Sequence, residues 1–414
     1  MESKFSSIIN LKTLMFYFIF FVLLYYENTV VLNIPISVIW KLLFLIYGII
    51  FIIRNNLFNG FLIVALIVSL KMIFHANFPL GFIMDSSEAV FFLALPIAIL
   101  YFKHKYRNNT DFLKLLLIKI SCFYIISSVP FILGILESRG GNLDYMGFDG
   151  NKLIGVFEAV AISSKVYALS TVVILFYYRE FNGKVNKLLF FLLITFGSIA
   201  TFQTLGRIGW AILISGFIYI FYSNKGKSIF VIALVSLCSI TLLTVNFINF
   251  ELKSIQNNIY YLKLTGTTKH KQNYTDLDLN ILSSGRGDLF KNSVKNFSAQ
   301  SFLYKLYGYG KKRSAELMLK SRGSSASAHN RFLEILEFSG VIGLFFFLIF
   351  IKKLSKYVFL RKTYYDLILL KFFFYIYVFT MIPSHGLSIY SNLLFAILIA
   401  FYINKNKQIY EISE

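Results

Sequence analysis

Cysteine, proline and charged residues are all scarce in this sequence of 414 residues. The only cysteines, Cys122 and Cys238, lie in apolar runs, which excludes a disulfide scaffold. Five prolines among abundant Phe, Ile and Leu exclude a disordered chain. Charged residues make up 15%, against roughly 25% in an average globular protein. Together with 57% hydrophobic residues, that deficit excludes a soluble multidomain enzyme.

Long apolar runs are what the sequence has in quantity. The hydrophobic residues, about 236 in all, are enough for about twelve membrane spans at roughly 20 residues each. The 47 Phe and 27 Tyr suit lipid-facing helices with aromatic residues at both interfaces. We therefore predict an all-α polytopic integral membrane protein with about twelve transmembrane helices. The predicted spans are residues 8–26, 36–53, 56–74, 86–102, 112–136, 157–178, 187–203, 208–223, 228–247, 333–351, 366–383 and 387–403.

Basic residues are distributed unevenly over the loops between these spans. One alternate set of loops holds basic runs such as 103–107 and 352–362, while the short loops of the other set offer little beyond Arg139, Lys152 and Arg207. Positively charged loops remain on the cytoplasmic side of a membrane, so we expect both termini in the cytoplasm. The net charge of +21 then reflects loop placement, and we expect no nucleic-acid partner.

One predicted connection, residues 248–332, is about 85 residues long, and loops beyond about 15 residues are usually functional or disordered. In the predicted topology it lies on the outer face. Apolar residues such as Leu289 and Phe290 recur in it at helical spacing, so we expect a helix from Asp288 to about Lys305 against the membrane surface. The predicted organisation is 1–247 for the first nine spans, 248–332 for a periplasmic loop with amphipathic surface helices, and 333–414 for the last three spans and a cytoplasmic tail.

Several polar residues at the outer ends of spans are candidates for chemistry. Arg207 lies at the start of a predicted helix, where an anion is favoured, and Arg286 opens the surface helix. His329 titrates near neutrality and can accept a proton, which makes it a candidate general base. Each also has a structural interpretation: a snorkelling arginine, a helix-capping turn, and a structural histidine before a capping Asn330.

Other outer polar residues are scattered, and they could bind a polar substrate or simply solvate the loops. No HExxH, CxxC or paired-aspartate motif is present, so a metal-dependent reaction is disfavoured. No GxxxxGK[ST] loop is present either, and we expect no ATP site and no cofactor. Lys165 lies deep in a predicted span, where an ionisable residue is a functional hypothesis. The scattered residues are His75, Asp85, Glu88, Arg139, Asp144, Asp149, Lys152, Glu158 and His385.

Five short stretches, in order, resemble the O-antigen polymerase and O-antigen ligase superfamily of bacterial envelopes. Lys152-Leu-Ile-Gly-Val-Phe resembles the basic-x-x-Gly-x-Phe stretch of that family. Leu-Gly-Arg207 resembles its arginine at an outer span end, and Gly-Arg286 its arginine early in the large loop. Tyr-Gly-Tyr309-Gly stands where the family has Gly-x-Gly, and Ala-His329-Asn stands where it has His-Asn. The resemblance covers residues 150–350.

Members of this superfamily move a glycan from an undecaprenyl-diphosphate carrier to a hydroxyl acceptor at the outer face of the inner membrane. The resemblance implies a metal-independent glycosyltransferase here, with His329 as the base or orienting group. Arg207 and Arg286 would offer forked donors to the departing diphosphate. The residues that it implies for binding the diphosphate and sugars are Arg207, Arg286, Asn330, Lys152, Arg139 and Tyr309.

Two activities fit these parts: a polymerase that joins lipid-linked O-antigen repeat units, and a ligase that hands the glycan to lipid A-core. We favour the polymerase, because such polymerases are typically as divergent and as rich in Phe, Ile, Lys and Asn as this chain. A lipid-linked-sugar flippase would instead show interrupted helices in two matching halves. The implied partners are the undecaprenyl-diphosphate-linked oligosaccharide, the bilayer, a chain-length regulator and a flippase, in the bacterial inner membrane.

Overall fold

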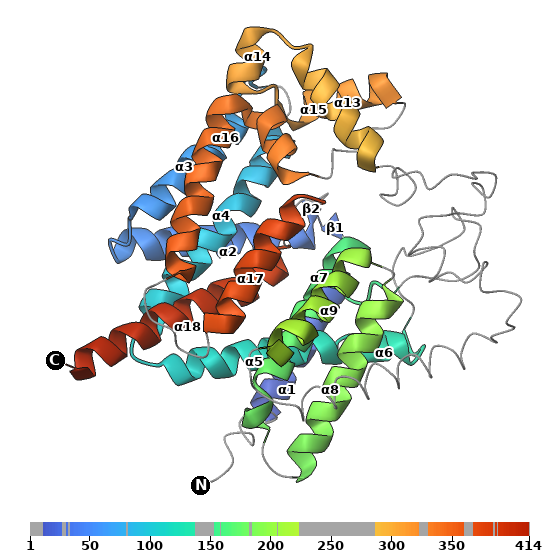
Figure 1. Ribbon diagram of the computed structural model, residues 1–414, viewed down its shortest axis with the longest axis vertical. Helices are drawn as coiled ribbons and strands as arrows, with labels where there is room; N and C mark the ends of the chain where they lie inside the picture. The colour runs from blue at the N-terminus through green and yellow to red at the C-terminus, as the bar shows by residue number, and fades with distance from the viewer. Residues whose placement is uncertain are drawn as a thin grey trace, which may run out of the picture. The chain divides into compact units, whose positions relative to one another are not determined.

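The computed structural model describes the chain in separate stretches, and its elements are helices apart from one short hairpin (Figure 1). In that hairpin β1 (Val30–Val31) pairs antiparallel with β2 (Ile34–Pro35). Of the described helices, three are long and apolar enough to cross a membrane: Thr110–Ile132, Asn186–Gln203 and Arg331–Val358. The described residues are 11–26, 30–31, 34–79, 82–136, 153–157, 159–181, 184–204, 206–222, 286–322, 330–359, 367–383, 386 and 388–413.

Every predicted span within the described residues is mostly helical, so the helical class is confirmed. Span 112–136 is divided between two helices, and span 228–247 lies outside the described residues. The number of helices that cross the membrane stays a prediction. The helix bounds for these spans are α1 Leu11–Tyr25, α2 Ile36–Arg54, α3 Gly60–Ile73, α4 Phe82–Lys105, α5 Thr110–Ile126, α6 Val129–Ile132, α7 Val160–Phe176, α8 Lys184–Gln203, α9 Arg207–Tyr222, α16 Arg331–Val358, α17 Leu367–Met381 and α18 Ile389–Ser413.

The chain forms two compact units, of which the first comprises residues 1–40 and 114–277. Helix α7 is at its centre and packs against both α8 and α9. Every side chain from Ser163 to Phe176 is buried. Small and hydroxyl-bearing residues on α7 make this possible, because they let neighbouring helices approach closely.

The second unit comprises residues 41–113 and 278–414. Helices α3 and α4 pack on each other, α16 packs against α3, and α18 packs against α4. Aromatic rings fill the contact between α3 and α16, where Phe61 stacks on Phe350 with the ring centroids 4.9 Å apart. Helix α16 is kinked at Gly340, whose φ is 71°.

Three shorter helices belong to the same unit and lie at the beginning of α16 (Figure 1): α13 (Arg286–Ser298), α14 (Phe302–Tyr307) and α15 (Gly310–Arg322). The single helix that we expected from Asp288 to about Lys305 is therefore wrong, because α13 ends and α14 begins within that range. The break lies before Ser301, which adopts an extended conformation at the N-cap of α14.

Candidate functional site

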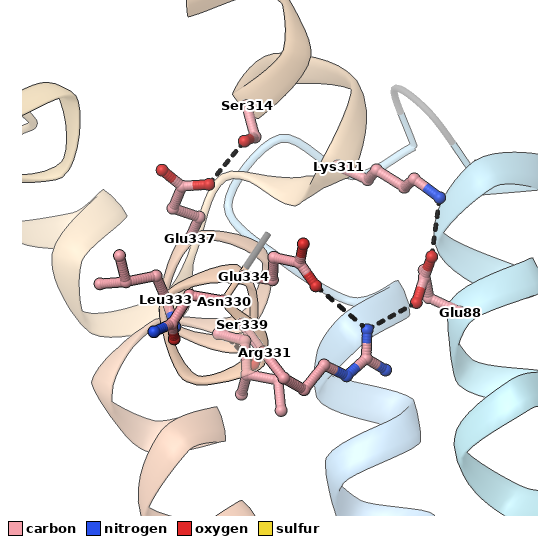
Figure 2. Close-up of polar contacts among 10 residues, drawn as sticks. Glu88, Lys311, Ser314, Asn330, Arg331, Leu333, Glu334, Glu337 and Ser339 are labelled. Atoms are coloured by element: carbon pink, nitrogen blue, oxygen red, sulfur yellow. Dashed lines mark hydrogen bonds and ion pairs between the residues drawn. The ribbon is translucent and has the colours of Figure 1, made fainter. Parts of the chain in front are cut away.

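The first turn of α16 is tied to its neighbours by a cluster of charged residues, two of them buried and two partly exposed, which we call the Glu88 cluster: Glu88, Lys311, Arg331 and Glu334 (Figure 2). The Glu88 carboxylate of α4 accepts from Lys311 Nζ at 2.7 Å and from an Arg331 guanidinium nitrogen at 2.8 Å. The same nitrogen of Arg331 lies 3.6 Å from Glu334. Arg331 is 3% exposed and Glu334 is 1% exposed. Buried charges are costly unless they are paired, so this pairing fixes α4, α15 and α16 against one another.

One helical turn further on, the carboxylate of Glu337 binds two of the shorter helices to α16. One oxygen accepts from the hydroxyl of Ser293 on α13, and the other accepts from the hydroxyl of Ser314 on α15 at 2.6 Å (Figure 2 draws the Ser314 bond). The backbone carbonyl of Glu337 also accepts from the backbone N–H of Tyr309 at 2.8 Å. All three contacts belong to α13, α15 or the turn before α15, so one residue of α16 anchors most of the described part of the large loop.

The Tyr-Gly-Tyr-Gly stretch forms the turn between α14 and α15 and packs against the kink of α16. Gly308 has a φ of 80°, and a Cβ atom there would overlap the backbone carbonyl of Phe338. Conversely, a Cβ atom at Gly340 would overlap the carbonyl of Leu306. Two backbones therefore approach each other at positions that only glycine fits.

Tyr309, within that turn, is 1% exposed. Its burial, together with the neighbouring Glu337 carboxylate, raises the pKa of the Tyr309 phenol above its ordinary value. A role for Tyr309 in binding substrate stays a prediction, since the structure places the side chain among protein atoms.

A second set of polar contacts holds the same turn to the connection between α3 and α4. His75 Nε2 lies 2.9 Å from Asp85 Oδ2, and the other Asp85 oxygen accepts from the backbone N–H of Lys311 at 2.8 Å. Asn77 donates to the carbonyl of Tyr309 at 3.1 Å and accepts from the hydroxyl of Tyr304 at 2.9 Å. The sequence allowed two roles for His75 and Asp85, substrate binding and solvation of the loops. In the structure their contacts hold the loop in place.

Asn330 caps α16, as its structural interpretation predicts. Its side-chain oxygen accepts from the backbone N–H of Leu333 at 3.1 Å. The candidate base His329 directly precedes this cap and lies outside the described residues, as do Arg139 and Lys152. Arg286 is the first residue of α13.

In the first unit, the structure brings two of the predicted stretches together. The backbone N–H of Leu153 donates to the carbonyl of Gln203 at 3.1 Å, so residues 153–157 lie beside the end of α8. Arg207, partly exposed, begins α9 a few residues later. Helix α9 meets α7 at Gly206 and Gly209, which lie against Ser164. Lys165, the next residue of α7, is 4% exposed, so its predicted burial is confirmed.

Sequence reasoning did not single out Lys311, Arg331 or Glu337, and it named Glu88 only among scattered polar residues. A usable signal was present. Carboxylates in or next to apolar spans are costly and need partners, and Glu88, Glu334 and Glu337 all occupy such positions. Among the residues that the structure describes, no three His, Cys, Asp or Glu side chains gather as metal ligands.

Comparison with known proteins adds one finding. Residues 188–348 match the family model Wzy_C, described as O-antigen ligase. Neither the search of curated proteins nor that of solved structures finds a match. The matched range runs from α8 into α16, and the resemblance found in the sequence is confirmed over it. Of the predicted site residues, it contains Arg207, Arg286, Tyr309, His329 and Asn330, while Arg139 and Lys152 precede it.

Substituting alanine for Gly308 tests the packing of the glycine turn against the kink of α16. We expect Gly308→Ala to lower the free energy of unfolding by more than about 3 kcal/mol, because backbone strain of about 1–2 kcal/mol adds to an overlap with the Phe338 carbonyl. Thermal unfolding of the protein in detergent measures the effect.

Gly386→Ala is the matched control. Its φ of 87° imposes similar strain, but a new Cβ atom would meet nothing nearer than Met381 Cγ at 3.4 Å. Equal destabilisation by the two substitutions would show that backbone strain accounts for the whole effect. It would contradict the close approach of residue 308 to the Phe338 carbonyl.

Proposed function

We propose, from the premise that residues 188–348 form an O-antigen ligase family domain, that this protein polymerises undecaprenyl-diphosphate-linked oligosaccharide repeat units into O-antigen or a related surface polysaccharide. The family domain makes the protein a ligase- or polymerase-type enzyme of surface polysaccharide biosynthesis. Its apolar helices make it a multi-pass membrane protein. The observation that carries the proposal is that this domain contains both predicted arginines and the predicted histidine.

The chemistry of the transfer explains why such residues are needed. The acceptor hydroxyl oxygen attacks the anomeric carbon, the bond from that carbon to the diphosphate oxygen breaks, and the hydroxyl proton moves to His329. Negative charge develops on the departing diphosphate, where the guanidinium groups of Arg207 and Arg286 stabilise it. Because this is a direct displacement, it inverts the anomeric centre. Diphosphate is a good leaving group, so the reaction needs no protein acid beside it.

Two observations support this assignment of roles. His329 directly precedes Asn330, the N-cap residue of α16, in the sequence and falls within the matched range. Arg207 begins a helix of 16 residues, and its N-terminal N–H groups add to the favourable potential for a diphosphate. We place the reaction at the periplasmic face of the inner membrane, with both termini in the cytoplasm. A chain-length regulator and a flippase are the partners that such a polymerase needs.

A ligase that transfers the glycan to lipid A-core is the second candidate, and it is favoured because the matching family is the O-antigen ligase family. Both enzymes use the same donor and leaving group, and they differ in the acceptor. Composition favours the polymerase, because the chain is rich in Phe, Ile, Lys and Asn.

Deleting the gene in its source strain and restoring it as wild type or His329→Ala tests the proposal. For a polymerase, deletion collapses the lipopolysaccharide ladder on a gel to core plus one repeat, and only wild type restores it. Removing a general base costs about 10²–10⁴-fold in rate, so His329→Ala restores no visible ladder.

His104→Ala, which changes an exposed histidine at the end of α4, is the control and restores the ladder. Loss of all O-antigen from the core, with long lipid-linked polymer accumulating, would indicate the ligase. A normal ladder from stably inserted His329→Ala would remove the histidine from the mechanism.

Arg207→Lys keeps the positive charge but loses the forked pair of donors. We expect the transfer rate to fall by about 10²-fold, the cost of removing one donor from a site that stabilises developing negative charge. Arg313→Lys serves as the control and leaves the rate unchanged. Arg313 is an exposed residue of α15, and its guanidinium lies 3.3 Å from the Glu316 carboxylate. Full activity in Arg207→Lys would identify Arg207 as a snorkelling residue instead.

A further inference from the structure

Apolar side chains lie exposed where α14 meets the connection between α3 and α4, and we call them the α14 patch. Phe302 is 79% exposed and Leu303 is 56% exposed. Leu303 and Tyr307 are four residues apart, so they share one face of the helix. A group of exposed apolar side chains marks a surface that contacts something other than water. The α14 patch consists of Phe74, Phe78, Phe82, Phe302, Leu303 and Tyr307.

The described contacts join the two parts of this patch into one surface. The rings of its three phenylalanines from the connection follow one another, with centroids 5.0 and 6.2 Å apart. Tyr304 of α14 donates its hydroxyl to the side chain of Asn77 in that connection at 2.9 Å. The ammonium of Lys71, in the last turn of α3, lies over the ring of Tyr307, 4.4 Å from its centroid. Helix α14 is therefore held against the end of α3.

Helix α16 shows at what depth in the membrane the patch lies. The chain from Val341 to Val358, after the kink, is about 18 residues long, or about 27 Å at 1.5 Å per residue. That length is close to the hydrocarbon thickness of a bilayer, about 30 Å. The end of α14 meets α16 at the kink itself, where Leu306 and Gly308 approach Gly340. The patch therefore lies at one boundary of the hydrocarbon.

The patch also continues the exposed apolar face of α3. Ile63, Leu70 and Phe74 are each about half exposed, and their spacing of seven and then four residues places them on one face of the helix. Helix α16 exposes a row of its own that begins with Val341, one residue after the kink. Exposed apolar faces of helices in a multi-pass membrane protein contact lipid. The same lipid surface thus extends from α3 onto α14.

We infer that the α14 patch is inserted into the lipid bilayer at the boundary between acyl chains and headgroups. Phe302 and Leu303 lie among the acyl chains, while Tyr307 and Lys71 lie at the level of the headgroups, where tyrosine and lysine side chains are favoured. Because α14 packs on α16, the patch holds the described loop helices at the membrane surface. The inference concerns lipid contact and does not depend on glycan transfer.

Helix α15 provides the contrast within the same part of the chain. Its side chains Arg313 and Glu316 are both about half exposed and pair with each other at 3.3 Å. Charged side chains of this kind remain in water, because hydrocarbon offers them no solvation. Lipid contact is therefore expected for α14 and not for this face of α15.

Spin labels on single cysteines of the full-length protein in phosphatidylethanolamine and phosphatidylglycerol liposomes test the inference. Cys238→Ser is present in every variant, and Cys122 is retained because it is buried. Phe302→Cys and Leu303→Cys place the label in the patch. Leu348→Cys, at an exposed position of α16, is the lipid control, and Glu316→Cys is the matched water control on α15.

Electron paramagnetic resonance measures how often each label collides with oxygen, which concentrates in hydrocarbon, and with a polar nickel chelate, which stays in water. We expect the ratio of oxygen to nickel collisions at Phe302→Cys and Leu303→Cys to resemble that of Leu348→Cys. It should exceed the ratio at Glu316→Cys by about tenfold or more, since a polar complex is excluded from hydrocarbon.

Two results would overturn the inference. A nickel collision rate at the patch as high as that of Glu316→Cys would show that α14 lies in water. Low rates with both reagents would show that protein covers the patch, and dipolar broadening of the spectrum would identify that protein as a second copy of this chain.

A second measurement applies if the cysteine variants do not accumulate in the membrane. Phe302→Trp adds a tryptophan to the native Trp40 and Trp210, and its fluorescence is measured in liposomes that contain brominated lipid. We expect the added fluorescence to be quenched, because bromine atoms on the acyl chains quench a ring that touches them. Added fluorescence that brominated lipid leaves unquenched would overturn the inference. Neither measurement involves glycan transfer, so its failure leaves the proposed function unaffected.

Discussion

A charge that leaves water must find a partner, and in the second unit this constraint acts at the beginning of α16. Arg331 and Glu334 are almost completely buried there, and the Glu88 carboxylate on α4 lies 2.8 Å from the arginine. Burying one of these charges without its partner would cost several kcal/mol, so the helices that carry them are held together. The position of α15 depends on the same carboxylate through Lys311. Pairing at one site thus fixes three elements.

The other contacts of the loop extend this anchor. Glu337 binds Ser293 of α13 and Ser314 of α15, and the glycine turn at Gly308 packs against the kink at Gly340. Each contact lies within one or two turns of the Glu88 cluster along α16. The helices α13, α14 and α15 are therefore fixed to α16, and α15 also to α4.

The sequence predicted the helices well, because long apolar runs determine where helices lie in a membrane protein. Lys165 was expected to be buried and is buried. The break between α13 and α14 was missed, since helical periodicity continues through Ser301 and only its backbone conformation reveals the interruption. Glu88 and Arg331 could not be paired from the sequence, because 243 residues separate them and no local pattern links such distant positions. The sequence indicates only that a carboxylate next to an apolar span needs a cationic partner, and it does not identify that partner.

The acceptor distinguishes the proposed polymerase from a ligase, and it can be tested with purified components. Full-length protein in liposomes is given the lipid-linked repeat unit as donor, with or without lipid A-core, and the products are resolved by size and by lipid. We predict longer lipid-linked glycans without lipid A-core, and no change in their yield when lipid A-core is added. Product that forms only on lipid A-core, or no product with either acceptor, would contradict the account.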